Sequence, residues 1–276
     1  MEPSALVGAA LGGVVGLLLA LTGAGGGILA VPLLVFGLHL GVAQAAPIGL
    51  FAVGVSAAIG AAMGLREGVV RYRAALLIGG VGMLLAPLGV WLAGRTPNAP
   101  LAIGFSAVLA GTAWRMFRAG RDTGVTATSC TVARADWPCV LDPEAGRLRW
   151  NRPCAWTLAA TGLLSGLLSG LLGVGGGFVI VPALTRYTNL AARSVLATSL
   201  AVIALVSVGG VGAAAWHGSM AWRLAGPFAA GAVAAMLAGR ALAARVSGRR
   251  LQQGFALLSA AVAVSLLAKG LGWPGP

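Results

Sequence analysis

Two glycine-rich motifs of identical spacing hold the residues of this chain best suited to bind an anion. Residues 22–34 read TGAGGGILAVPLL and residues 172–184 read LGVGGGFVIVPAL, so G-x-GGG-x-x-x-VP-x-L occurs twice at an offset of 150 residues. Each glycine in a helix costs about 1 kcal/mol relative to alanine, so each triple glycine predicts a helix break. The first N–H groups of a helix that restarts after such a break lack intrahelical partners and attract anions.

Each motif continues into a proline. Pro32 and Pro182 follow their triple glycines by five residues and should kink a short helix or free a carbonyl group. An alternative role for the glycines is close helix packing, which small residues favour in membranes. Breaks at corresponding positions of two halves are, however, typical of the binding sites of transporters. We therefore interpret the two motifs as part of a substrate pathway.

A second polar cluster follows one helix later in the second half only. Thr198 and Ser199 could donate hydroxyl hydrogens to an oxyanion, although such groups in membrane helices often bond only to their own backbone. The equivalent positions of the first half are Ile48 and Gly49, and Gln44 just upstream is a partial substitute. The predicted substrate-binding residues are Gly25, Gly26, Gly27, Pro32, Gln44, Gly175, Gly176, Gly177, Pro182, Thr198 and Ser199.

The composition indicates a polytopic α-helical membrane protein. Of the 276 residues, 58% are hydrophobic and 9% are charged, whereas a soluble domain has about 25% charged residues. Several uncharged stretches reach the roughly 20 residues that span a bilayer. The net charge of +13 comes from residues between these stretches, so it reads as a topology signal and not as a nucleic-acid-binding surface. The N-terminus MEPSALVGAA lacks the basic segment of a secretory signal and reads as the first membrane helix.

Matches at the offset of 150 residues extend well beyond the motifs and define the domain organisation. We assign residues 1–118 to a first membrane repeat, 119–153 to a polar linker, and 154–276 to a second membrane repeat. Each repeat holds four or five crossings, because the short piece after the glycines need not cross fully. The predicted helical pieces are 4–22, 27–41, 43–65, 74–94 and 98–117, then 155–172, 177–190, 194–215, 224–243 and 251–269.

The distribution of arginine favours an inverted arrangement of the two repeats. The loop near residue 70 is rich in arginine, whereas its counterpart near residue 220 has one arginine. The reverse holds for the next pair of loops, since the loop near residue 95 has one arginine and its counterpart near residue 245 is rich in arginine. Five crossings per repeat, with the linker in the cytoplasm, would place both rich loops inside, where Lys and Arg collect. Four crossings would instead leave the repeats parallel. Inverted repeats are common among secondary transporters.

Residues that usually carry enzymatic or metal chemistry are sparse. No Asp or Glu lies well inside a predicted span, which argues against a cation path or a carboxylate proton relay. His39 and His217 fall at helix ends and read as interfacial. Cys130, Cys139 and Cys154 have spacings unlike a metal site, so we expect free thiols in a cytoplasmic loop, with a metal or sulfur-relay role as the alternative. We expect no cofactor, no catalytic residue and no bound metal.

The doubled motif resembles that of a known family. GAGGGILAVPLL and GVGGGFVIVPAL, with ATSL after the second and an HG-x-x-x-W-R loop at 217–223, resemble the TauE/SafE sulfite-exporter family over about 5–118 and 155–268. The resemblance implies a multi-pass transporter of sulfur-containing anions in the bacterial inner membrane. The family often has Thr-Ser where this chain has Ile48 and Gly49, which argues against a two-fold symmetric site.

The sequence hypothesis is therefore an exporter of small sulfur-containing oxyanions such as sulfite or organosulfonates. The anion would bind between the repeats, and the protein would have the lipid bilayer as its surroundings, no nucleic-acid partner and possible homo-oligomers. A non-transporting membrane scaffold subunit is the main rival. A membrane enzyme of sulfur metabolism is another, although Cys139 or Cys154 would be its only plausible nucleophile.

Overall fold

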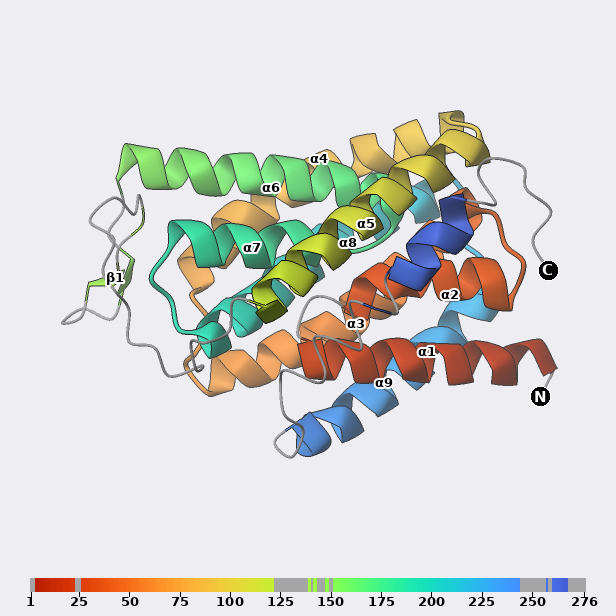
Figure 1. Cartoon of the computed structure of the whole chain (residues 1–276), viewed down its shortest axis with the longest axis horizontal. Coiled ribbons are helices and arrows are strands. Elements are labelled where there is room, and N and C mark those ends of the chain that lie inside the picture. The colour runs from red at the N-terminus through yellow and green to blue at the C-terminus, as the bar shows by residue number, and fades with distance from the viewer. Residues whose placement is uncertain are drawn as a thin grey trace.

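The computed structural model is almost entirely helical (Figure 1). The structure describes residues 3–22, 26–121, 139, 141–142, 147–148, 151–243, 257 and 260–267, and only the backbone of 3–5, 21–22, 115–121, 141–142, 147–148 and 240–243. The first half holds α1 (Pro3–Thr22), the 3-10 turn η1 (Gly26–Leu29), α2 (Ala30–Gly37), α3 (Val42–Arg66), α4 (Tyr72–Arg95) and α5 (Asn98–Arg121). The second half holds α6 (Arg152–Leu172), α7 (Gly177–Tyr187), α8 (Ala192–Trp216) and α9 (Trp222–Ala243), with a further helical segment at 260–267.

The helices of the two halves fall at corresponding positions in the sequence. The bounds of α3 and α8 differ by 150 residues at both ends, and α4 and α9 begin 150 residues apart. Gly68 and Gly218, which follow α3 and α8, adopt φ angles of 69° and 66° in the same tight turn. The piece expected at 27–41 is shorter, because it is divided into η1 and α2 and the chain leaves the helix after Gly37.

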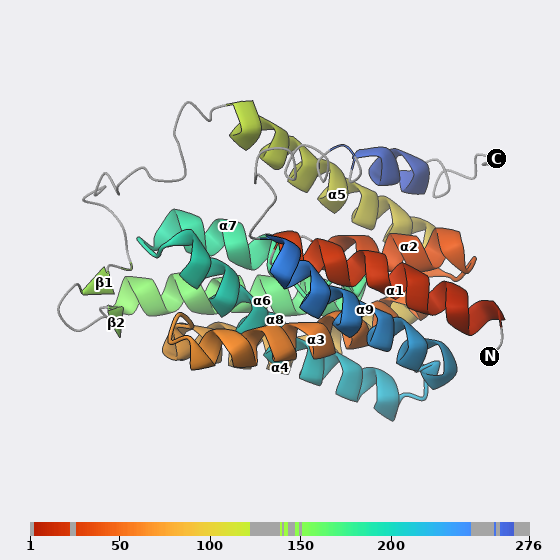
Figure 2. The same cartoon turned by 90° about the horizontal axis from the view of Figure 1, so that it is seen from below.

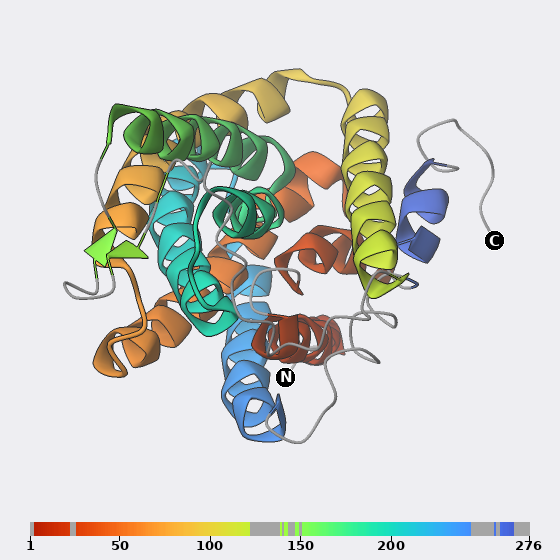
Figure 3. The same cartoon turned by 60° about the vertical axis from the view of Figure 1, so that its left-hand side comes forward.

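Several helices are long and apolar enough to cross a bilayer. Within the described ranges, α3, α4, α6 and α8 satisfy both criteria, and the segments 6–20 and 26–37 are shorter apolar helices. The basic residues of α3 and α4 lie in their first or last turns, as at Arg66 and Arg95. The chain is accordingly a helical membrane protein, whose α5 lies at the periphery and packs on α3 (Figures 2 and 3).

The most extensive contacts between the two halves are those of α1 with α9 and of α4 with α6, and α3 and α4 also pack on α8. In the α1–α9 and α4–α6 pairs, glycines bring the backbones so close that an added Cβ would collide with the partner backbone, which is how small residues drive helix association in membranes. These approaches are Gly12 to Phe228 and Gly16 to Ala232 and, at the offset of 150, Gly162 to Ile78 and Gly166 to Gly82. The first helix of each half thus packs on the fourth helix of the other half.

Within the described part of the chain, the two ends of the helix bundle differ in their number of arginines. The N-terminal ends of α1 and α6 lie at opposite ends of the helix bundle (Figures 1 and 2). We call the end with the α6 N-terminus the basic end, because the helix termini there carry Arg66, Arg71, Arg73, Arg152, Arg186 and Arg193. The described part of the opposite end carries Arg95 and Arg223.

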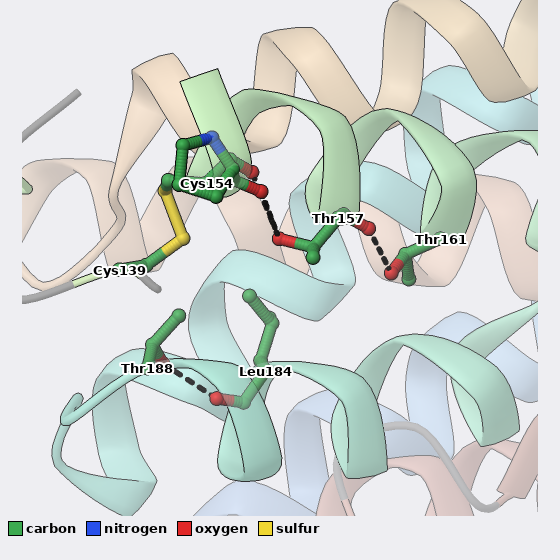
Figure 4. The surroundings of a disulfide bond; sticks show 7 residues. Cys139, Cys154, Thr157, Thr161, Leu184 and Thr188 are labelled. Carbon is green, nitrogen blue, oxygen red and sulfur yellow. Dashed lines mark hydrogen bonds between the residues drawn. A yellow bond between two sulfur atoms is a disulfide. The ribbon is translucent and has the colours of Figure 1, made fainter. Parts of the chain in front are cut away.

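A disulfide at the basic end corrects one prediction from the sequence. Cys139 and Cys154 are bonded, with their Cα atoms 5.0 Å apart (Figure 4), so the expectation of free thiols is wrong for both; Cys130 lies outside the described residues. The backbone of Cys139 also pairs with Thr188 just after α7, and its N–H donates to the Tyr187 carbonyl oxygen at 3.3 Å. The 15-residue separation gave no sign of this contact, because it depends on how the linker lies against α6 and the end of α7 in the folded protein.

Little of the predicted linker 119–153 is described. It includes a two-stranded antiparallel sheet of β1 (Leu141–Asp142) and β2 (Arg147–Leu148), in which Leu141 pairs with Leu148. Helix α6, which follows the linker, begins at the basic end (Figure 1).

Candidate functional site

The second glycine motif forms a sharp break between α6 and α7. Helix α6 ends at Leu172, and Gly173, Gly175 and Gly176 have φ angles of 70°, 76° and 70°. Only glycine adopts these left-handed angles cheaply, so the sequence of the motif dictates the break. The chain then reverses, and α7 begins at Gly177 inside the protein, where residues 173–177 are all buried.

The first glycine motif also separates two helices, since α1 ends at Thr22 and the chain is helical again from Gly26. Gly25 lies outside the described residues, and Gly26 and Gly27 begin the buried turn η1, which leads into α2. A Cβ on Gly26 would collide with the backbone of Leu19 near the end of α1, so the turn folds back directly onto the helix before it.

The two breaks meet at the centre of the protein. A Cβ on Gly27 would lie 2.7 Å from the carbonyl oxygen of Val174, in the other motif. The buried side chain of Val53, from α3, lies between the motifs, at 3.2 Å from the Cβ position of Gly27 and 3.3 Å from that of Gly175. Ile203, the counterpart of Val53 in α8, lies 2.9 Å from the same point on Gly175. Motifs 150 residues apart therefore form one structural centre with α3 and α8.

The start of α7 has the features of an anion site. Its N-cap, Gly176, has no side chain to cap the helix. The first backbone hydrogen bond of the helix is donated by the Val179 N–H to the Gly176 carbonyl oxygen, at 3.0 Å. The N–H groups of Gly177 and Phe178 therefore lack a partner within the helix, at its positive end. A small oxyanion is the ligand that such a terminus accepts.

A buried hydroxyl group completes the polar character of this terminus. The Oγ atom of Ser165, in α6, is the atom nearest to the position that a Gly176 Cβ would take. Ser165 is fully buried, and its hydroxyl has no hydrogen-bond partner among the described residues. The same holds for Ser169, one turn further along α6. Such a group costs free energy until it finds a partner, so each hydroxyl is a candidate ligand donor.

These two serines are absent from the site predicted from the sequence. Their positions in the first half are held by Val15 and Leu19, so a comparison of the halves for apolar-to-polar changes within α1 and α6 could have found them. Among the side chains that the structure describes, the unpartnered hydroxyls beside the central breaks, Ser165 and Ser169, both come from the second half.

The prolines of the two motifs occupy different environments. Pro32 is buried in the first turn of α2, where a missing N–H costs little. Pro182 lies in the interior of α7 and leaves the carbonyl oxygen of Phe178 without its usual partner. Pro182 also lines a cavity of about 710 Å³ between α5, α6 and α7, near the disulfide.

The hydroxyls of Thr198 and Ser199 are engaged within the protein. Both side chains are buried in α8. The Thr198 Oγ1 accepts a hydrogen bond of 3.1 Å from the backbone N–H of Arg71, and the Ser199 hydroxyl donates to the Leu196 carbonyl oxygen at 2.8 Å. Thr198 thus ties the α3–α4 loop to α8 at the basic end.

Gln44 lies apart from the two breaks. It is exposed in the first turn of α3 and lines a cavity of about 550 Å³ at the opposite end. The cavity extends down to Ile48 and to Gly170, and Gly170 lies three residues before the α6–α7 break. Gln44 is therefore placed at the mouth of a path toward the break and not at the break itself.

The part of the chain that the structure describes offers no metal site. No group of three or more His, Cys, Asp or Glu side chains gathers there. Glu67, the acidic residue whose side chain the structure describes, is the C-cap of α3 and so lies at an end of the bundle.

Comparisons with known proteins relate this chain to membrane transporters. The family model "Sulfite exporter TauE/SafE" matches residues 8–266. A "Probable membrane transporter protein" of Xylella fastidiosa strain 9a5c is 31% identical over 260 residues, covering 93% of this chain and 92% of the relative. A protein of the same description from strain Temecula1 is 29% identical over 263 residues, with coverage of 93% and 92%. No solved structure matches this chain. The chain belongs to the TauE/SafE sulfite exporter family, and its relatives are named as transporters and not as enzymes.

Proposed function

We propose that this protein exports small sulfur-containing oxyanions, such as sulfite or organosulfonates, across the bacterial inner membrane. The observation that carries the proposal is the buried N-terminus of α7, where left-handed Gly176 meets the unpartnered hydroxyl of Ser165. The N–H groups of Gly177 and Phe178, with the serine hydroxyl, would hold the oxygen atoms of the anion.

We also propose that the two halves are inverted repeats in the membrane. Three features support this arrangement: the N-terminal ends of α1 and α6 lie at opposite ends of the bundle, the helix pairs are exchanged between halves, and close contacts recur at the offset of 150. Inverted repeats with central helix breaks favour transport by rocking of one half against the other. Because arginine gathers at cytoplasmic loops, we assign the basic end to the cytoplasm.

The membrane potential can supply the driving force for export. An anion leaving a negative interior gains about 2.3 kcal/mol per charge for each 100 mV. Export therefore requires no coupled cation. The acidic residues of the sequence lie at the terminus, in a loop and in the linker, so the predicted spans hold no carboxylate that could bind such a cation.

Flux into proteoliposomes tests the proposal. The purified protein is reconstituted, and the uptake of labelled sulfite, thiosulfate, sulfate and methanesulfonate is measured against empty vesicles. We expect saturable uptake of at least one anion and its loss in Gly176→Leu, because the side chain would fill the space beside Ser165. Gly226→Leu is the matched control, since a Cβ at this exposed position of α9 meets no atom within 4 Å. Uptake by a folded Gly176→Leu protein at the wild-type rate would rule out this site.

A further inference from the structure

The α3–α8 pair has a cavity at each end, built from corresponding residues but very different in size. The cavity at the opposite end has a volume of about 550 Å³, and the one at the basic end about 140 Å³. Pairs of lining residues that are 150 positions apart are Ala43 and Arg193, Ala46 and Leu196, Pro47 and Ala197, Leu50 and Leu200, Ala20 and Gly170, and Val69 and Ser219. The two cavities are therefore built from corresponding positions, and the one at the basic end is much the smaller.

An ion pair lies at the mouth of the smaller cavity. The Nη2 atom of Arg193, in the first turn of α8, lies 2.9 Å from the Oε2 atom of Glu67, the C-cap of α3. Both residues line the cavity, and their side chains are 75% and 37% exposed. The pair thus bridges the two halves at the rim, where water can reach it.

The larger cavity cannot form an equivalent bridge. The counterpart of Arg193 is Ala43, and the counterpart of Glu67 is His217. An alanine side chain has no polar group to pair with the histidine. The electrostatic link between α3 and α8 is therefore one-sided, and it favours the state in which the basic end is closed.

We propose that Glu67 and Arg193 form the gate of the basic end, and that separating them lets the anion enter the smaller cavity from that side. The inference rests on the proposed transport function. The structure is then the state that is open at the opposite end, with Ala43 in the open cavity and Ala197 in the closed one. Exchange of the two cavity volumes would accompany each transport step. An exposed ion pair is weak enough to open readily, with an expected bias of roughly two- to five-fold in population.

Thiol labelling tests the gate without any substrate. Ala197→Cys and Ala43→Cys are made singly in a Cys130→Ser background with the Cys139–Cys154 disulfide intact, and the purified proteins are treated with a hydrophilic maleimide. We expect Arg193→Ala to raise the labelling rate of Ala197→Cys about two- to five-fold. The exchange Glu67→Arg with Arg193→Glu should restore the slow rate, because the pair can form again. Arg186→Ala, an exposed arginine in the last turn of α7, is the matched control and should leave the rate unchanged.

The second cysteine separates gating from general loosening. Labelling of Ala43→Cys should change less than two-fold in Arg193→Ala, because that cavity is already open. A parallel rise at both cysteines, or no rise at Ala197→Cys, would overturn the gate. Sulfite flux is measured on the same samples. Normal flux with an unchanged labelling rate would support the transport function and contradict the gate. A changed labelling rate without sulfite flux would support the gate and contradict only the choice of sulfite as the anion.

Discussion

Gly27 lies against the carbonyl oxygen of Val174, so the two glycine motifs touch through their backbones. The Cβ position of Gly27 is 2.7 Å from that oxygen, nearer than a carbon atom can approach without displacing the chain. A break in one half thus fixes the position of the break in the other. A side chain at Gly27 would have to displace the Val174 carbonyl group, so movement of one half against the other has to accommodate this contact.

Gly27→Ala should therefore impair transport through packing and not through chemistry. The added methyl group must move Val174 or Val53, and overpacking of this kind costs about 1–3 kcal/mol. We expect a lower melting temperature in detergent and a slower flux. Gly226→Ala, at an open position of α9, should change neither. Equal thermal stability and equal flux for Gly27→Ala and the wild type would show that the space beside the Val174 carbonyl oxygen can hold a methyl group.

Ser165→Ala should weaken anion binding without destabilising the fold. The hydroxyl has no hydrogen-bond partner among the described residues, so its removal leaves no protein group unpaired. A hydrogen bond to a charged group contributes about 1.5–3 kcal/mol, equivalent to a roughly 10- to 150-fold rise in the apparent KM. Transport as a function of anion concentration gives the KM, and thermal unfolding gives the stability.

Ser207→Ala is the matched control for this change. Ser207 is likewise a buried serine without a recorded partner, and it faces Gly54 across the α3–α8 contact instead of the α7 terminus. Its removal should leave the KM within about two-fold of the wild type. A similar KM for both variants and the wild type would remove Ser165 from the site.

The apolar runs predicted the helices well because charged residues are excluded from the spans. The segment expected at 43–65 coincides with α3, and that at 194–215 with α8. The glycine spacing also placed the α6–α7 break correctly, since the left-handed angles at Gly175 and Gly176 require glycine. The piece after the first break is shorter than predicted, because α2 ends at Gly37 and the chain turns through His39, whose φ is 54°.

Contacts between distant segments could not be predicted in the same way. The disulfide of Cys139 and Cys154 depends on how the linker meets α6 and α7, which the local sequence does not encode. Ser165 and Ser169 were missed because single serines in a helix commonly bond to their own backbone. Only the position of Ser165 beside Gly176 distinguishes it from the other serines in these helices.

The disulfide provides a test of the orientation in the membrane. Disulfides in the cytosol are usually transient, whereas those in the periplasm persist. With the basic end in the cytoplasm, the Cys139–Cys154 bond lies in a reducing compartment, and we expect quenched cells to hold a measurable fraction of reduced protein beside the bonded form. Acid quenching, followed by labelling of thiols with a maleimide mass tag before and after reduction, measures the reduced fraction. A bond already complete in quenched cells would place the linker outside and reverse the proposed orientation.

Transport without a coupled cation should be electrogenic. For a univalent anion such as methanesulfonate, a potential of 100 mV corresponds to about 2.3 kcal/mol, or a roughly 50-fold concentration ratio at equilibrium. Potassium gradients with valinomycin set the potential across proteoliposomes, and labelled anion measures its accumulation. We expect accumulation in vesicles with a positive interior and exclusion from those with a negative interior, at equal pH and sodium on both sides. Accumulation that ignores the potential but follows a proton or sodium gradient would require a coupling ion, and the site at the start of α7 would then need a cation-binding partner.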